Sequence, residues 1–110
     1  MPSTLRLSQQ GLRVLRVFLD AFTEDVRVEL AGTDLLAAAH ISSGTLYPIL
    51  LRFEQAGLLE SRWERERPES LGRPRRRFYR MTQEGARVAR EALLDLSLPR
   101  VNPAAKLGLA

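Results

Sequence analysis

The sequence predicts a mainly α-helical domain with one small β-hairpin, an α+β fold. Two observations predict it. Capping residues followed by apolar residues at helical spacing mark four segments, and two strand-like runs flank a loop at 65–74 that is rich in arginine, proline and glycine. The order is helix, short strand, helix, turn, helix, hairpin, helix, with only a few residues in the turn. This order is typical of a winged helix-turn-helix domain followed by one C-terminal helix.

Length and composition restrict the possible classes of protein. A chain of 110 residues, 45% of them hydrophobic, suits one globular domain. The chain contains no cysteine, which excludes disulfides and thiolate metal sites. No apolar run reaches the roughly 18 residues that a membrane-spanning helix needs, and the N-terminal residues lack the apolar core of a secretion signal. We therefore expect a cytoplasmic protein.

The first helix is expected to begin after Ser8, a plausible N-cap, and to end near Phe22. Its apolar face is wider than one small core needs. Such a face indicates either a second subunit packed against the helix or a central position for the helix within its own domain. The apolar residues of this helix are Leu12, Val14, Leu15, Val17, Phe18, Leu19, Ala21 and Phe22.

A short strand and a second helix are expected next. Residues 26–30 alternate apolar and charged side chains, which predicts a strand that Gly32 ends. The second helix then runs to about Ala39 and is capped by Thr33 or Asp34. Its candidate core positions are Leu35, Leu36 and Ala38.

Residues 41–44 form a predicted tight turn into a third helix, which a serine caps and which runs to about Ala56. Gly57 fits a C-terminal glycine cap. The buried side of this helix is expected to carry Leu46, Leu50 and Phe53. The other side is expected to carry Thr45, Pro48, Arg52 and Gln55.

Two strands at 58–64 and 75–81 are predicted to form the hairpin, around a loop at 65–74 that is too broken for regular structure. Thr82 then caps a last helix that runs to about Leu96. These elements suggest a winged helix-turn-helix domain at 1–82, a C-terminal helix for dimerisation at 83–98 and a flexible tail at 99–110.

Basic charge is concentrated in the hairpin. The chain has a net charge of +4, and residues 62–80 hold arginines at 62, 65, 67, 73, 75, 76, 77 and 80 against glutamates at only 64, 66 and 69. Such a concentration indicates either a site for a polyanion or a solvated, charged loop.

Two motifs carry a family resemblance. One is Ser43-Gly44-Thr45-Leu46-Tyr47-Pro48-Ile49-Leu50, followed by Arg52-Phe53-Glu54 and Gly57-Leu58-Leu59-Glu60; the other is the run 72–82 with Glu84-Gly85 after it. Together they resemble the PadR family of winged-helix regulators, at the spacing that family uses, over about Ile41 to Leu94. Residues 30–34 depart from the Gly-Tyr-Glu-like start of the family's second helix. The resemblance implies a DNA-binding regulator, and the single C-terminal helix implies its short-tailed form.

The expected DNA-binding residues lie at the start of the third helix and in the hairpin. A recognition helix presents small or polar groups to base edges and phosphates at its N-terminal end, although a serine there can also serve only as a cap. Tyr47 can contact DNA or pack on the wing, and Arg52 can reach the backbone or remain solvated. The helix residues are Ser42, Ser43, Gly44, Thr45, Tyr47, Pro48 and Arg52. The wing residues are Arg73, Arg75 and Arg77, with Arg76 on the other side.

A homodimer is expected, held by the first and last helices. The candidate interface residues are Leu15, Phe18, Phe22, Ala89, Leu93 and Leu96. The expected function is sequence-specific regulation of transcription, as a repressor on a pseudo-palindromic operator in double-stranded DNA. The alternatives are a protein-interaction module and a regulator that responds to a small aromatic ligand. Trp63 could line a ligand pocket but is expected to pack in the hairpin, and no cavity is expected.

An enzyme is not expected. His40 is the only histidine, and no cluster pairs a nucleophile with a base. A metal site would lack a second ligand of comparable quality, so no metal and no cofactor are expected.

Overall fold

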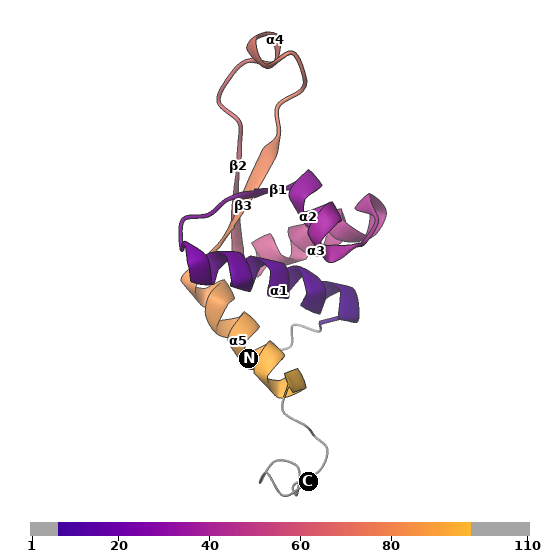
Figure 1. Cartoon of the computed structure of the whole chain (residues 1–110), viewed down its shortest axis with the longest axis vertical. Coiled ribbons are helices and arrows are strands. Elements are labelled where there is room, and N and C mark those ends of the chain that lie inside the picture. The colour runs from indigo at the N-terminus through magenta and orange to yellow at the C-terminus, as the bar shows by residue number, and fades with distance from the viewer. Residues whose placement is uncertain (1–6, 98–110) are drawn as a thin grey trace, which may run out of the picture.

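The computed structural model describes residues 7–97, with side-chain placement through residue 94. These residues form five helices and three strands (Figure 1). The elements are α1 (Gln9–Glu24), β1 (Leu30–Ala31), α2 (Gly32–Ala39), α3 (Ser43–Gln55), β2 (Leu59–Trp63), α4 (Pro68–Leu71), β3 (Arg77–Met81) and α5 (Gln83–Ser97).

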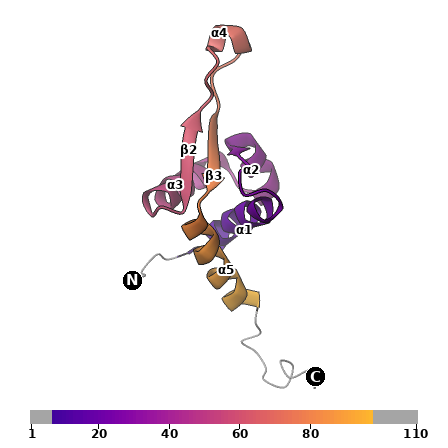
Figure 2. The same cartoon turned by 90° about the vertical axis from the view of Figure 1, so that its left-hand side faces the viewer.

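The predicted fold class, an α+β winged helix-turn-helix, is confirmed. The helices α1, α2 and α3 form the body, and the β2–β3 hairpin with its tip at α4 projects from it as the wing. Helix α5 starts at the body and extends away from the end opposite the wing, as both views show (Figures 1 and 2). The wing and the last helix therefore extend in opposite directions from one small core.

The sheet has three antiparallel strands in the order β1-β3-β2. The predicted hairpin is confirmed, with Ser61 opposite Tyr79. The strand expected at 26–30 is wrong in its position, because the strand in the structure is Leu30–Ala31. The side chain of Asp25 accepts a hydrogen bond from the Arg27 N–H (2.9 Å), and the Asp25 carbonyl accepts one from the Val28 N–H (3.0 Å). These bonds close a turn directly after α1, and the alternating pattern falls on that turn.

Every major element contributes to one apolar core. Helix α1 supplies Val14, Leu15 and Phe18, and α3 supplies Leu46, Leu50 and Phe53, as predicted for α3. In α2 the prediction needs correction, because Leu35 is buried but Ala38 is exposed, and Ala39 is buried in its place.

The start of α2 also differs from the prediction. Gly32 is the first residue of the helix, and neither Thr33 nor Asp34 is its N-cap. Asp34 instead lies in the first turn and accepts a hydrogen bond from the Ala31 N–H (2.9 Å). The Asp34 carboxylate thus satisfies the backbone N–H of Ala31, the N-cap residue, which has no partner within the helix.

The predicted caps of the other helices are largely confirmed. Ser8 accepts from the Gly11 N–H and Thr82 from the Gly85 N–H, both at 2.9 Å. Gly57 has a φ of 80° and follows the end of α3, where the Leu58 N–H donates to the Phe53 carbonyl (2.8 Å). At the start of α3, Ser42 holds the N-cap position, but its hydroxyl bonds to Thr45 Oγ1 (3.2 Å) and no backbone N–H.

The loop between the wing strands contains one helical turn, α4, which the prediction of irregular structure missed. Pro68 opens the turn and Gly72, with a φ of 70°, closes it. The predicted last helix is confirmed as α5, and it packs along α1 through the buried Ala86 and Ala89. The tail predicted at 99–110 lies outside the described residues.

Candidate nucleic-acid interface

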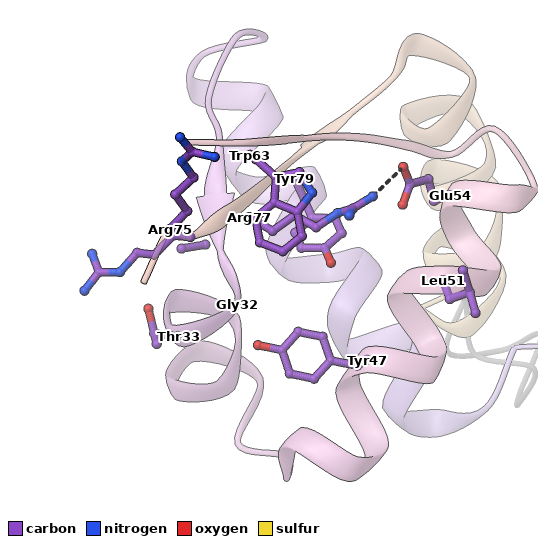
Figure 3. A pocket seen from close by; sticks show the side chains of 11 residues that line it. Gly32, Thr33, Tyr47, Leu51, Glu54, Trp63, Arg75, Arg77 and Tyr79 are labelled. Atoms are coloured by element: carbon purple, nitrogen blue, oxygen red, sulfur yellow. Dashed lines mark ion pairs between the residues drawn. The ribbon is translucent and has the colours of Figure 1, made fainter. Parts of the chain in front are cut away.

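The surface between α2, α3 and the wing is hollowed into a cleft of about 580 Å³ (Figure 3). Figure 2 shows the wing rising between α2 and α3. Helix α2 and the residue before it line the cleft with Ala31, Gly32 and Thr33; α3 lines it with Tyr47, Leu51 and Glu54; the wing lines it with Trp63, Arg75, Arg76, Arg77 and Tyr79. The cleft therefore brings together α3 and the arginine-rich part of the wing.

Tyr47 leans from α3 over the start of α2 (Figure 3). A Cβ atom on Gly32 would overlap the Tyr47 hydroxyl, so the glycine makes room for this ring. Tyr47 is nevertheless 45% exposed. The ring therefore packs against α2 and not on the wing, and it keeps enough exposed surface that its contact with DNA stays a prediction.

The other residues of this region that were predicted to contact DNA lie mostly on the exposed side of α3. Ser43, Gly44, Pro48 and Arg52 are exposed, and so is Ser42 before the helix, while Thr45 is half-buried. Pro48 lies inside the helix and has no N–H, so the Gly44 carbonyl lacks its usual helical donor.

Leu51 was not predicted as part of this surface. It is 56% exposed and lies one turn after Tyr47 on the side that faces the cleft. The spacing of four residues from Tyr47 is the signal that could have identified it.

Two of the three predicted wing arginines lie beside carboxylates of the protein. Arg73 forms two hydrogen bonds with the Glu64 carboxylate, at 2.8 and 3.0 Å. Arg77 donates to the Ser61 hydroxyl (2.7 Å), lies 3.6 Å from the Glu54 carboxylate, and covers the Trp63 ring at 5.2 Å. In the structure both arginines are thus engaged with carboxylates, and their contact with phosphates stays a prediction.

Arg75 and Arg76 are the exposed wing arginines beside the cleft. Neither side chain forms an ion pair with any residue in the described part of the chain, although Arg75 donates to the Glu66 carbonyl (2.8 Å). Arg76 was expected on the other side because successive residues of a strand alternate. That reasoning was wrong, since β3 begins only at Arg77.

The loop at the tip of the wing is closed by an electrostatic contact around Glu64. The hydrogen bonds from the Arg73 side chain and from the Arg76 backbone N–H lower the pKa of Glu64 from its ordinary value of 4.5 to about 2. The ionised carboxylate is thus the form that holds the two wing segments together.

Acid should open this contact at an unusually low pH. Because the pKa of Glu64 is depressed, its contribution to wing stability is complete above about 4.5 and is lost as the pH falls through about 2. We expect the Glu64 carboxyl resonance, followed by NMR, to titrate near pH 2 in the wild type and nearer 4.5 in Arg73→Ala. A wild-type midpoint near 4.5 would contradict the contact.

The expected dimer surface also needs correction. Leu15, Phe18, Phe22 and Ala89 are buried in the core of a single protomer, so as placed they offer no surface to a partner. Leu93 is half-buried, whereas the adjacent Leu94 is 58% exposed. The side chain of Leu96 lies outside the described residues.

Trp63 and the cleft differ from the expectation of a packed indole and no cavity. Trp63 is 55% exposed, and its ring lies at the mouth of the cleft with Arg77 against it (Figure 3). Among the described residues, no group of three or more histidine, cysteine, aspartate or glutamate side chains is arranged to hold a metal ion. No helix in the same residues has both the length and the apolar character needed to cross a membrane.

Comparison with known proteins gives a family and several structural relatives. The sequence model of the transcriptional regulator PadR-like family matches residues 30–91. A PadR family transcriptional regulator from Eggerthella lenta is 32% identical, with 77% of this chain and 75% of that chain covered and a TM-score of 0.56. A protein from Streptococcus mutans is 22% identical over 98% of this chain and 97% of its own, with a TM-score of 0.64.

A further relative is NadR, whose structure was solved in complex with 4-hydroxyphenylacetate. It is 26% identical over 80% of this chain, with a TM-score of 0.59, and this chain spans only 53% of the length of NadR. No curated protein matches the sequence at a significant level.

Proposed function

Because the chain belongs to the PadR-like family of transcriptional regulators, we propose that it is a homodimeric repressor that binds a pseudo-palindromic operator in double-stranded DNA. One observation carries this proposal: the exposed side of α3 and the arginines Arg75 and Arg76, which lack ion pairs in the described structure, border the same concave surface. A DNA duplex can engage both at once, with the helix in its major groove and the wing on the flanking backbone. Its DNA target would place the protein in the cytoplasm.

Helix α3 would supply sequence recognition. Its first turn presents small residues and free backbone N–H groups, which let the helix end approach base edges and a phosphate closely. Tyr47 and Leu51 follow with exposed apolar surface that can contact thymine methyl groups. Arg52 lies one helical turn after Pro48 and can reach a phosphate at the groove edge.

The wing would supply affinity that depends little on sequence. Arg75 and Arg76 are exposed beside the cleft, and their guanidinium groups can follow the phosphate backbone. Arg73 and Arg77 would act differently. Arg73 would close the wing loop through Glu64, and Arg77 would join the hairpin to α3 through Glu54.

Helix α5 would supply the dimer contact. Its C-terminal half extends beyond the body and carries the exposed Leu94 (Figure 1). Pairing such helices around a two-fold axis would bury Leu94 and Leu93 and set the two copies of α3 about 34–36 Å apart, one turn of DNA. The proposal thus replaces the buried residues of the expected interface by the end of α5.

A charge at Leu94 should dissociate the dimer. We expect Leu94→Glu to shift the mass measured by light scattering at micromolar concentration from twice the 12.4 kDa of one chain to that of one chain, because a carboxylate would be buried without a partner. Val26→Glu is the control, since Val26 is similarly exposed (57%) but lies in the connection between α1 and β1. A wild type that is monomeric, or a Leu94→Glu variant that stays dimeric, would contradict this interface.

Operator binding tests the proposed function directly. Genomic DNA fragments that bind the purified protein are selected and sequenced, and the affinity of the recovered operator is compared with that of random DNA. We expect Tyr47→Ala to reduce the difference in binding free energy between operator and random DNA by about 1–3 kcal/mol, the usual contribution of one base contact. The thermal midpoint of unfolding should remain nearly unchanged. Val26→Ala, a truncation on another surface, should leave the ratio intact. Failure to enrich any fragment would overturn the DNA-binding function and favour a protein-interaction module.

The ligand of NadR supports a further part of the proposal. NadR was crystallised with 4-hydroxyphenylacetate, a small aromatic acid. We extend this to the present chain as the proposal that its DNA binding responds to a small-molecule effector of the same chemical kind.

A further inference from the structure

The face of the wing sheet opposite to the cleft carries paired charges. Successive strand residues point to opposite faces, so Trp63, Arg77 and Tyr79 line the cleft while Arg62 and Phe78 lie on the other, outer face. We propose that the ion pair of Arg62 with Glu29 on this outer face is a strap that fixes the angle of the wing to the body, and that DNA binding depends on the strap although neither side chain touches DNA. This inference rests on the proposed DNA-binding function and adds two positioning residues to it.

Arg62 spans the width of the sheet. The strand order is β1-β3-β2, so β1 and β2 are the two outer strands. Arg62 lies in β2 opposite Phe78 of β3, and its guanidinium lies over the Phe78 ring, 5.1 Å from the ring centre. The same guanidinium donates two hydrogen bonds, of 2.7 and 2.8 Å, to Glu29, the residue directly before β1. One side chain thus joins the two outer strands across the middle one.

The strap supplements a short stretch of strand pairing. β1 pairs with β3 at two positions, whereas β2 pairs with β3 at five. Few backbone contacts therefore hold the hairpin against the segment that leads into α2. Ala31 and Gly32 line the cleft and follow closely after Glu29 in the chain. A contact at Glu29 consequently acts on the position of the wing relative to α2 and the cleft.

A second contact holds the wing from its cleft face. Arg77 of β3 lies 3.6 Å from the carboxylate of Glu54 in α3. The two ion pairs thus lie on opposite faces of the sheet and lead to different parts of the body, the strap toward the start of α2 and Arg77 toward α3. A hairpin that is held from both faces has less freedom to swing relative to α3 than a hairpin held from one.

The geometry of the strap is that of a strong pair for a partly exposed site. The guanidinium Nε and Nη2 of Arg62 each bind a different carboxylate oxygen of Glu29, the two-point arrangement that makes such pairs specific in direction. The side chains are 45% and 30% exposed, and the Phe78 ring covers one side of the guanidinium. The hydrogen bond from Arg62 lowers the pKa of Glu29 below its ordinary value of 4.5, so the carboxylate is ionised at neutral pH.

Direct contact of Arg62 with phosphates is the alternative role, and the charge of Glu29 separates the two. If charge alone mattered, loss of the Glu29 carboxylate would strengthen DNA binding, because it removes a negative charge that repels phosphates. If the strap matters, the same loss weakens DNA binding, because Arg75 and Arg76 are then carried by a wing that must be ordered on binding. The two roles therefore predict changes of opposite sign.

The variant Glu29→Gln tests the strap on operator and random DNA at several salt concentrations. A partly exposed ion pair changes an equilibrium by about twofold to fivefold, so we expect the two wings of a dimer to lose about four- to 25-fold in affinity. The slope of log affinity against log salt should stay nearly unchanged, because the phosphate contacts of Arg75 and Arg76 remain. Stronger or unchanged binding would overturn the strap.

A double variant and a matched control complete the design. Arg62→Gln should weaken binding by a similar factor, and Glu29→Gln with Arg62→Gln should be no weaker than either single variant, because the same contact is lost once. A double variant that binds as the wild type does would overturn the strap and leave charge alone. Glu60→Gln is the control, since Glu60 pairs with Arg80 (2.7 Å) but both lie within the hairpin. We expect it to bind DNA at least as tightly as the wild type, and an equal loss there would also overturn the strap.

The protein without DNA gives an independent readout. Residual dipolar couplings of the backbone amides of β2 and β3 are measured by NMR and compared with those of α1 and α3. In the wild type both sets should fit one alignment tensor; in Glu29→Gln the couplings of the wing should be reduced, with the thermal midpoint of unfolding nearly unchanged. A wing in Glu29→Gln that is as ordered as in the wild type would overturn the strap while the DNA-binding function stands. A wing that loosens in a protein that enriches no DNA fragment would support the strap and overturn the proposed function instead.

Discussion

Alanine in place of Leu50 is expected to lower the free energy of unfolding by about 2–5 kcal/mol, because a leucine deleted from a packed core leaves a cavity. Leu50 is 1% exposed and packs with Phe18, Leu46 and Phe53 in the single core of the domain. In a domain this small, such a loss is a large part of the total stability. Urea unfolding followed by circular dichroism gives the free energy and, through the slope, a check that unfolding remains two-state.

The neighbouring residue is a matched control. Leu51 has the same side chain on the same helix but is 56% exposed on the cleft side. Leu51→Ala is therefore expected to change stability by no more than about 0.5 kcal/mol. The same variant should weaken operator binding if the exposed leucine touches bases. Similar losses of stability in the two variants would mean that the side of α3 assigned to the core is wrong.

The wing arginines should have the largest effect on DNA binding. The double variant Arg75→Ala with Arg76→Ala removes two proposed phosphate contacts from each subunit, four from a dimer. Each neutralised phosphate contributes about 0.9 to the slope of log affinity against log salt, so the slope should fall by about 3.6. The affinities for operator and random DNA should fall by similar factors, because phosphate contacts carry no sequence information.

Two controls separate charge from wing geometry. Arg27→Ala removes a similarly exposed arginine in the connection between α1 and β1 and should leave the slope unchanged. Arg73→Ala should also change the slope little, since Arg73 is held by Glu64, although it should loosen the wing. If Arg73→Ala reduced the slope of log affinity against log salt and the double variant did not, Arg73 would contact phosphates and Arg75 and Arg76 would not.

Helix caps, the buried side of α3 and the family motif could be predicted from the sequence alone, because each depends on residues close together in the chain. A cap needs a hydroxyl three residues before the N–H that it binds, and Ser8 and Thr82 are read from that spacing alone. The buried row of α3 follows from apolar residues three or four positions apart. The family motif is also a local string, so the winged fold and the regulator family follow from the order of the residues alone.

The roles of individual arginines and of Tyr47 depended on the tertiary structure. Arg73 and Arg77 looked equivalent to Arg75 in the sequence, but their partners Glu64, Ser61 and Glu54 are 9, 16 and 23 residues away along the chain and meet them only in the folded wing. Tyr47 rests on α2 because Gly32, far from it in the sequence, has no side chain.

The surfaces for partners were decided by the same long-range packing. The wide apolar face of α1 suggested a dimer interface, yet the structure uses Leu15, Phe18 and Phe22 to fill its own core. The cleft beside Trp63 is lined by residues from α2, α3 and the wing, which are distant in the sequence and meet only in the folded domain. Periodicity along the sequence indicates which side of a helix or strand is buried. Strand register and helix packing decide which element covers that side and which distant residues lie together.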